Sequence, residues 1–323
     1  MTRYALGTFS RPDRQRFVGL VIGDRVAALS DLSDAAPAKL SVLGLLEDWT
    51  ASVLFLDDLA ARADTSAPAW QPVEVLVVNP PVDLPRQIFC TGANYRKHVV
   101  DMTVDVGVGP EGLSREELRK WAEDMMDRRA ATGEPYVFTK PVSAVSGPND
   151  DLVLPLTTQA PDWELELGVI IGVGGFQISR ANALNHVAGY AIVNDISARD
   201  LIPRTDYRQL GTDWLRAKGQ TGFLPFGPYL VPSHHVGDPL NLAMKLTVSG
   251  QVMQDESTSD MLFDISRQIE YISTYCRLMP GDLICTGSPA GNGTHYGRYL
   301  KPGDVMIGEI EGLGMQRALC VAP

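Results

Sequence analysis

Three acidic side chains interrupt strongly apolar stretches of the sequence, and their spacing suits a metal site. Glu164 and Glu166 alternate within ELELGVIIGV, a predicted strand. Their side chains therefore point the same way, roughly 6–7 Å apart at the backbone. The apolar residues that follow indicate a strand buried on both faces. Two carboxylates at the head of such a strand repel each other and lose hydration unless a cation neutralises them.

Asp195 repeats this anomaly in a second apolar segment, YAIVNDIS, where aspartate is disfavoured. Three oxygen ligands without neighbouring His or Cys favour Mg²⁺ over zinc, with Mn²⁺ and Ca²⁺ as alternatives. Three carboxylates would leave about half of an octahedral shell for substrate and water. The residues alone leave a second interpretation open, in which the Glu pair lies on a solvated face and the aspartate forms a turn.

The elements that would position these carboxylates are mostly strands, with two clear helices. The first follows Ser114, which forms a predicted capping box with Glu117, and it ends at Gly133. The second covers about 260–278. The apolar stripe of the first helix consists of Leu118, Trp121, Ala122 and Met125.

The order of these elements predicts an α+β fold dominated by strands. Strict β-α-β alternation is missing, which argues against a doubly wound sheet or a TIM barrel. Residues 1–78 are predicted to form a small N-terminal β-rich domain, with a hairpin at Gly23-Asp24. The proline-rich NPPVDLP marks the boundary to a second domain, 79–323.

The composition limits which binding partners and which cellular compartment we expect for this protein. The chain has 323 residues, 45% apolar and 21% charged, with a formal net charge of −11 and no Lys/Arg run. Neither nucleic acid nor an anionic membrane surface is expected as a partner. The amino terminus lacks an apolar segment of signal-peptide length, and the four cysteines show no CxxC spacing. We therefore expect a cytoplasmic protein with reduced thiols.

Motifs in a consistent order resemble the fumarylacetoacetate hydrolase superfamily. The resemblance runs over roughly residues 80–320, and more weakly over 1–78. It implies a mixed β-sandwich roll, a homodimer, and a metal-binding triad of Glu164, Glu166 and Asp195. The motifs are TGANYRKH, PYVFTKPVSAVSGPNDDLVLP, DWELELGVIIG, GYAIVNDISARD, WLRAKGQTGFLPFGPYLV, MPGDLICTGSPAGNG and LKPGDVMIGEIEGLG.

The same resemblance implies a catalytic set. His98 in NYRKH matches a histidine that acts as base, and Asp101 stands where relatives commonly carry a glutamate that orients it. Lys218 matches a lysine that holds substrate or developing oxyanion. Without the family context, His98 would be an ordinary loop histidine and Lys218 a surface lysine. The expected substrate contacts are Tyr95, Arg199, Thr286 and Ser288.

Three functions follow from these expectations. The first is metal-dependent hydrolysis of a C–C bond in a β-diketo acid, such as an acylpyruvate or a fumarylacetoacetate-like compound, in catabolism. The second uses the same metal site for decarboxylation, hydration or isomerisation of an aromatic ring-cleavage or keto-sugar acid intermediate. The third is a metal-stabilised binding protein without turnover. In the first two, the partner is a small anionic keto acid.

A helical insertion around 105–133 distinguishes this chain from compact members of the family it resembles. Because the insertion adjoins His98, it should reshape the entrance to the site. We expect the Trp121/Met125 face of its helix to pack over the site and to set substrate size. Deleting residues 108–132 should then change substrate preference more than metal affinity.

Overall fold

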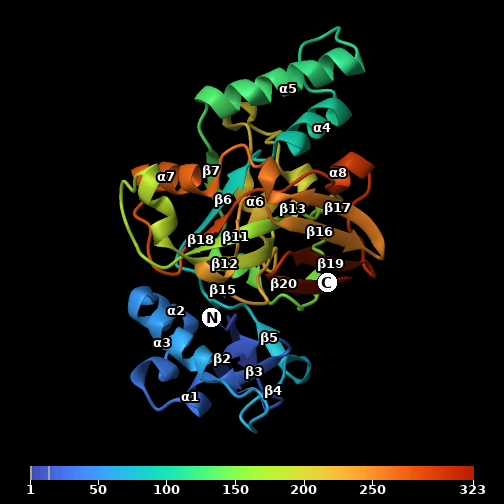
Figure 1. The fold of residues 1–323 in the computed structure, drawn as a ribbon. Coiled ribbons are helices and arrows are strands. Elements are labelled where there is room, and N and C mark those ends of the chain that lie inside the picture. Colours follow the sequence, from blue (N-terminus) through green and yellow to red (C-terminus); the bar gives the residue numbers. More distant parts are fainter. Residues whose placement is uncertain (1, 14) are drawn as a thin grey trace.

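Figure 1 shows a computed structural model that describes residues 2–13 and 15–323. The first eighty or so residues, in blue, lie below a larger strand-rich part. None of the described helices is long and apolar enough to cross a membrane.

The amino-terminal part is a five-stranded sheet covered by helices. Its strand order is β4-β3-β2-β1-β5, and the predicted hairpin is present, with Gly23 at φ +62° between β2 and β3. The strands are β1 (Ala5–Ser10), β2 (Arg16–Ile22), β3 (Arg25–Ala28), β4 (Gln71–Pro72) and β5 (Val77–Asn79). The helices are α1 (Leu29–Leu32), η1 (Ala36–Lys39), α2 (Val42–Leu46), α3 (Trp49–Ala61) and η2 (Val73–Val75).

Helix α3 is the main element that the sequence did not predict in this part. Asp48 caps it by accepting a hydrogen bond from the Ala51 N–H. Leu56 and Leu59 are buried on its inner face. The apolar segment VEVLVV is divided: its first three residues form η2, and its last two begin the short strand β5.

The central sheet positions the predicted metal ligands. Its strand order is β15-β12-β11-β18-β6-β7, and β11 and β12 are buried along their whole length, as their apolar sequences predict. They pair antiparallel, with Leu165 opposite Asn194, so the start of β11 lies beside the end of β12. The strands are β6 (Ile88–Gly92), β7 (Tyr136–Thr139), β11 (Leu165–Ile171), β12 (Val187–Asn194), β15 (Val231–Pro232) and β18 (Leu283–Cys285).

A second sheet packs against the central one and completes the core. Its order is β17-β16-β19-β20-β9, and burial alternates along β16, which gives it one core-facing side. Apolar side chains of both sheets, such as Leu167 and Leu246, share one cluster. The strands are β9 (Leu152–Val153), β16 (Ala243–Val248), β17 (Gln251–Ser257), β19 (Val305–Ile310) and β20 (Gly314–Val321). The predicted strand-dominated α+β class is confirmed.

Short ladders and helices complete the chain. Strands β8 (Val145–Ser146) and β10 (Pro161–Asp162) pair with β14 (Leu224–Pro225) and β13 (Ser197–Ala198). The α-helices of this part are α4 (Arg96–Val106), α5 (Arg115–Thr132), α6 (Trp214–Lys218), α7 (Ile265–Tyr275) and α8 (Gly293–Tyr296). The 3-10 turns are η3 (Val142–Ala144), η4 (Arg180–His186), η5 (Arg199–Leu201), η6 (Arg208–Leu210), η7 (Ser233–His235) and η8 (Thr258–Asp260).

Both predicted helices form, and one of them is shorter than expected. Helix α5 has the predicted capping box of Ser114 and Glu117. Helix α7 begins only after Asp264, whose side chain accepts from the Arg267 N–H and caps the helix there. The first residue of the predicted span, Asp260, instead ends the 3-10 turn η8 (Thr258–Asp260).

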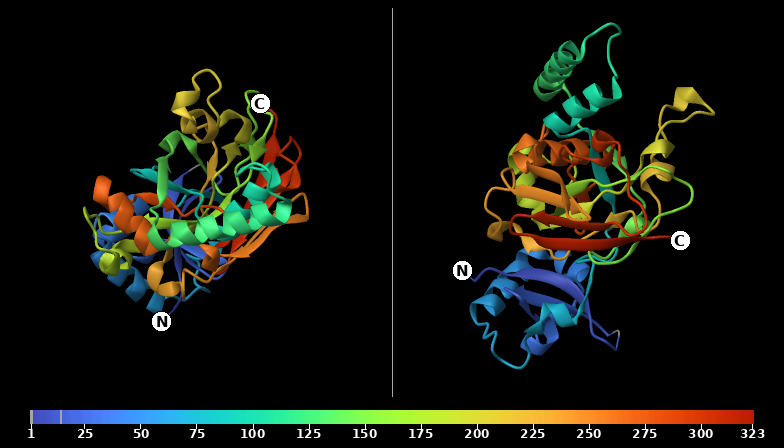
Figure 2. Two further views of the ribbon diagram at one scale, coloured as in Figure 1. Left: turned by 90° about the horizontal axis from the view of Figure 1, so that it is seen from above. Right: turned by 90° about the vertical axis from the view of Figure 1, so that its right-hand side faces the viewer.

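Helices α4 and α5 lie side by side at the end of the molecule opposite the amino-terminal part (Figures 1 and 2). Their contact is a small apolar cluster built on Val100, Ala122 and Met126, with Trp121 and Met125 packed against it. The expectation that the Trp121/Met125 face covers the site is therefore corrected. That face packs against α4, because the stripe finds its apolar partner there.

Candidate active site

The three predicted metal ligands meet at one end of the central sheet, where β11 begins and β12 ends. Glu164 immediately precedes β11, Glu166 lies in it, and Asp195 immediately follows β12. The antiparallel register brings the three carboxylates together, and one oxygen from each lies within 4.8 Å of the others. All three side chains are buried, and Glu166 is only 2% exposed.

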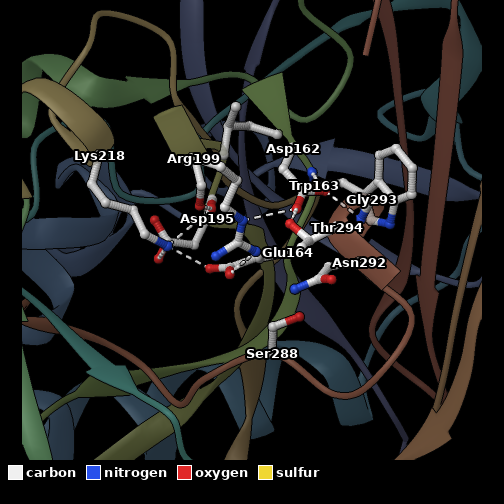
Figure 3. Close-up of polar contacts among 12 residues, drawn as sticks. Asp162, Trp163, Glu164, Asp195, Arg199, Lys218, Ser288, Asn292, Gly293 and Thr294 are labelled. Atoms are coloured by element: carbon white, nitrogen blue, oxygen red, sulfur yellow. Dashed lines mark hydrogen bonds and ion pairs between the residues drawn. The ribbon is translucent and has the colours of Figure 1, made fainter. Parts of the chain in front are cut away.

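Lys218, from α6, reaches into this carboxylate cluster. Its Nζ donates to Glu164 and, over 2.5 Å, to Oδ2 of Asp195, as Figure 3 shows. Lys140, from the segment after β7, approaches Asp195 from another side. Its Nζ donates to the carboxylate and to the carbonyl of Phe223 at 2.6 Å. Both lysines are buried, so their positive charges act on the carboxylates with little solvent screening.

Arg199 holds Glu164 and Asp162 on the opposite side (Figure 3). Its Nη2 donates to Oε1 of Glu164 at 2.5 Å, and its Nε donates to Oδ2 of Asp162 at 2.8 Å. Asp162 is fully buried and also accepts from the backbone N–H of Gly293 and of Trp163. Arg199 therefore braces a metal-ligand candidate.

The positive charges are distributed unevenly over the carboxylates. Burial alone would raise the pKa of Glu164, but Arg199 and Lys218 outweigh it and hold that pKa well below its usual range. Burial and the charge of Asp195 raise the pKa of Glu166 well above its usual range. Its Oε2 accepts one backbone hydrogen bond, from Gly287 at 2.8 Å.

The donor set fits a hard divalent cation. All three converging groups are carboxylates, and among the described residues Glu164 and Asp195 have ion pairs whereas Glu166 has none. A divalent ion would supply the missing positive charge, and oxygen-only ligands suit Mg²⁺, Mn²⁺ or Ca²⁺.

A cavity of about 240 Å³ opens beside the carboxylates. Helix α4 contributes His98, Val99 and Met102 to its lining, and Trp214 and Phe138 form an aromatic wall. The Trp214 and Phe138 rings stack with centroids 4.8 Å apart. The indole Nε1 of Trp214 is buried and has no hydrogen-bond partner within the described part of the chain. The cavity thus combines charged, apolar and donor groups at the scale of a small organic acid.

His98 projects from the first turn of α4 into this cavity. Burial lowers its pKa to about 4, and the positive charges of Arg199 and Lys218 act in the same direction. The imidazole is therefore neutral near pH 7 and can accept a proton.

Asp101 does not hydrogen-bond to His98 among the residues that the structure describes. Its carboxylate instead accepts a hydrogen bond from Nη1 of Arg119, on α5, at 3.0 Å. Asp101 therefore does not orient the His98 ring as expected, because Arg119 of α5 is its hydrogen-bond partner instead.

Of the four expected substrate contacts, two line the cavity and two do not. Ser288 and Arg199 line the cavity. Tyr95 lies in the core with its hydroxyl 3.7 Å from the sulfur of Met244, so the expectation of a substrate contact is corrected. The Thr286 hydroxyl donates to the Leu167 carbonyl at 2.9 Å, which ties it to β11 and leaves it no role as a side-chain donor to substrate.

Sequence reasoning missed Asp162, Trp214 and Phe138. A signal for Asp162 was present in DWELEL, where it extends the alternation of Glu164 and Glu166 by one more step. The aromatic pair had no such signal, since the two residues lie far apart in the chain and meet only through the placement of α6 beside β7.

Residues 87–321 match the family model described as "Fumarylacetoacetate (FAA) hydrolase C-terminal". The chain is 46% identical, over 187 residues, to "2,4-didehydro-3-deoxy-L-rhamnonate hydrolase" of Sphingomonas sp. (strain SKA58), covering 57% of this chain and 64% of that protein. It is 37% identical, over 237 residues, to "Oxaloacetate tautomerase FAHD2A, mitochondrial" of Bos taurus, covering 73% of this chain and 66% of that protein. The matches thus span just under two thirds of these relatives.

Among solved structures, the chain resembles maleylpyruvate hydrolase from Sphingobium sp. SYK-6 in complex with manganese (II) ion and pyruvate. The TM-score is 0.71 and the identity 26%, and the match covers 98% of this chain and 99% of that one.

Proposed function

Because the chain belongs to the fumarylacetoacetate hydrolase family, we propose that it is a metal-dependent hydrolase that cleaves a C–C bond in a β-diketo acid. The observation that carries this proposal is the convergence of Glu164, Glu166 and Asp195 beside a cavity that also holds His98 and Lys218. Relatives named as hydrolases support the reaction class.

Glu164, Glu166 and Asp195 would hold the ion, either Mg²⁺ or Mn²⁺. The bound ion would supply Lewis-acid polarisation of a carbonyl oxygen and stabilise enolate charge. The solved relative that contains manganese supports Mn²⁺ as one occupant of such a site. With the ion bound, less of the charge on Glu164 and Asp195 would fall to Lys218, and its ammonium would become available to a substrate oxygen.

The substrate would be a small keto acid with a negative charge. The protein is acidic overall, yet Arg199 and Lys218 line the cavity, where they favour an anion. The Trp214 indole N–H is a further donor at its wall, whereas the Ser288 hydroxyl donates to the Pro289 carbonyl at 3.2 Å. Val99 and Met102 would contact the apolar part of the substrate and exclude water from it.

His98 would act as the general base that takes a proton from the attacking water. Its neutral imidazole at the cavity wall meets the first requirement for that role. Asp101 would act indirectly, since it ties α4 to α5 through Arg119 and so helps to fix the helix that carries His98.

The alternative is a lyase, hydratase or isomerase that uses the same carboxylate cluster. One observation favours it: within the described part of the chain, no carboxylate is hydrogen-bonded to His98 to orient its ring, and enolising reactions can proceed without a water-activating base. The relative named as an oxaloacetate tautomerase supports this alternative.

Turnover measurements with matched variants test the proposal. The substrates are a panel of acylpyruvates and oxaloacetate, each assayed with Mg²⁺ and with EDTA. We expect metal-dependent C–C hydrolysis that collapses in Glu166→Gln and in His98→Ala but persists in Glu309→Gln, an exposed control on β19. Metal-dependent decarboxylation or isomerisation that survives His98→Ala would support the alternative. Metal binding without turnover of any substrate would contradict both and indicate a binding protein.

A further inference from the structure

A second cluster of metal-ligating side chains lies outside the candidate active site, where α3 meets η7. Asp57 comes from α3, and His234 and His235 come from η7. One ring nitrogen of each histidine and one carboxylate oxygen of Asp57 lie within 4.8 Å of one another. The Nε2 of His234 is 3.0 Å from Oδ1 of Asp57.

Two polar atoms at this cluster are buried without a partner in the described residues. They are Nε2 of His235 and the hydroxyl oxygen of Tyr4. The Tyr4 ring stands edge-on to His235, with centroids 4.6 Å apart and an interplanar angle of 83°. Buried polar atoms are nearly always hydrogen-bonded, and an unpaired one calls for a water molecule or an ion.

The chemistry of the cluster suits a cation. One carboxylate and two imidazoles are groups that bind divalent metals, and they converge at the point where the two unpartnered polar atoms lie.

We propose that Asp57, His234 and His235 form a second divalent-metal site that takes a transition metal of the zinc class. Two imidazoles and one carboxylate favour Zn²⁺, Co²⁺ or Ni²⁺ over Mg²⁺ and Ca²⁺, which prefer oxygen alone. The remaining coordination positions would be filled by water, with the Tyr4 hydroxyl beside them.

The consequence of this site is a link between distant parts of the chain. Asp57 and His234 are 177 residues apart in sequence. Figure 1 shows α3 in the lower part of the molecule, whereas α4 and α6, which line the cavity, lie above it. A metal held by α3 and η7 would therefore stabilise the packing of these two elements without entering the catalytic cavity.

Zinc titration of the full-length protein tests the site, with Mg²⁺ in excess to saturate the carboxylate cluster. A chromophoric chelator competes for Zn²⁺ and reports stoichiometry and affinity. We expect one Zn²⁺ per chain in wild type and in Glu166→Gln, and a loss of more than about tenfold in affinity in Asp57→Asn and His235→Ala. His186→Ala, which removes a histidine outside the cluster, should bind as wild type does.

Two further measurements use the wild-type protein alone, so they do not depend on whether a variant folds. Zinc at about 100 times its dissociation constant should raise the melting temperature by about 4 °C. In imidazole ¹⁵N spectra of the wild type, two of the five histidines should shift as zinc binds. Zinc binding that disappears only in Glu166→Gln, or that is unchanged in both Asp57→Asn and His235→Ala, would overturn the proposal. So would histidine spectra in which no pair shifts.

Discussion

Replacing Gly287 with alanine would disturb the backbone that supports Glu166. Gly287 has φ +98°, and an added Cβ would lie 2.9 Å from both the carbonyl oxygen of Thr91 and the Cβ of Asn94. The first contact is with backbone, which cannot move aside easily. The Gly287 N–H also donates to Oε2 of Glu166 at 2.8 Å, so any shift weakens that hydrogen bond.

The expected cost has two parts. The backbone conformation costs an alanine about 1–3 kcal/mol. The hydrogen bond to the Glu166 carboxyl, whose pKa is raised, contributes about 0.5–1.5 kcal/mol. We therefore expect Gly287→Ala to destabilise the fold by about 2–4 kcal/mol. Loss of a group that orients a ligand should also weaken metal binding by about 10–100-fold.

Gly250→Ala provides the matched control for this prediction. Gly250 also has a positive φ, +82°, but no atom lies within 4 Å of its added Cβ. It should therefore show the cost of the backbone conformation alone. Urea unfolding reports stability, and Mn²⁺ titration followed by electron paramagnetic resonance reports metal affinity. The reasoning is refuted if Gly287→Ala costs no more than Gly250→Ala and binds Mn²⁺ as tightly as wild type.

Three further predictions concern pH, charge and the insertion. Burial raises the pKa of Asp282 from 3.8 to about 6, so the stability from its protonated form is present below pH 3.8 and lost as pH rises through 6. Asp282→Asn should remove this loss of stability, which is about 1–2 kcal/mol after solvent screening. The free energy of unfolding, measured in urea, should then differ less between pH 4 and pH 7 than it does in wild type. An unchanged difference between the two pH values contradicts this. Lys140→Met should remove one of the two lysine partners of the buried Asp195 carboxylate and cost about 1.5–3 kcal/mol in EDTA, with part recovered in Mg²⁺; equal loss in both buffers contradicts this. Deletion of 108–132 should lower kcat and leave the Mn²⁺ dissociation constant unchanged, because α5 contacts α4 and no proposed metal ligand; weaker Mn²⁺ binding contradicts this.

The sequence predicted best what depends on local pattern. Uninterrupted apolar residues identified β11 and β12, and the polar residues that break the pattern identified Glu164, Glu166 and Asp195. The capping box at Ser114 located the start of α5. Neighbouring residues within a few positions carry the signal for the strands and the capping box. The metal triad also depended on the family resemblance, since the residues alone left a solvated Glu pair and a turn-forming aspartate open.

Features that depend on tertiary contacts could not be predicted in this way. Tyr95 and His98 lie in one short motif, yet one side chain enters the core and the other the cavity, depending on how α4 docks. Asp101 pairs with Arg119 only because α5 folds back along α4. Asp57 is 177 residues from His234, and only the packing of α3 on η7 brings the two together.

The most direct test of the central claim measures Mn²⁺ binding and turnover in the same samples. We predict that one Mn²⁺ per chain binds to the carboxylate cluster and that turnover rises in proportion to its occupancy. Glu164→Gln, Glu166→Gln and Asp195→Asn should each lose both together. Full turnover in EDTA, or Mn²⁺ binding that persists in all three variants, would contradict the account.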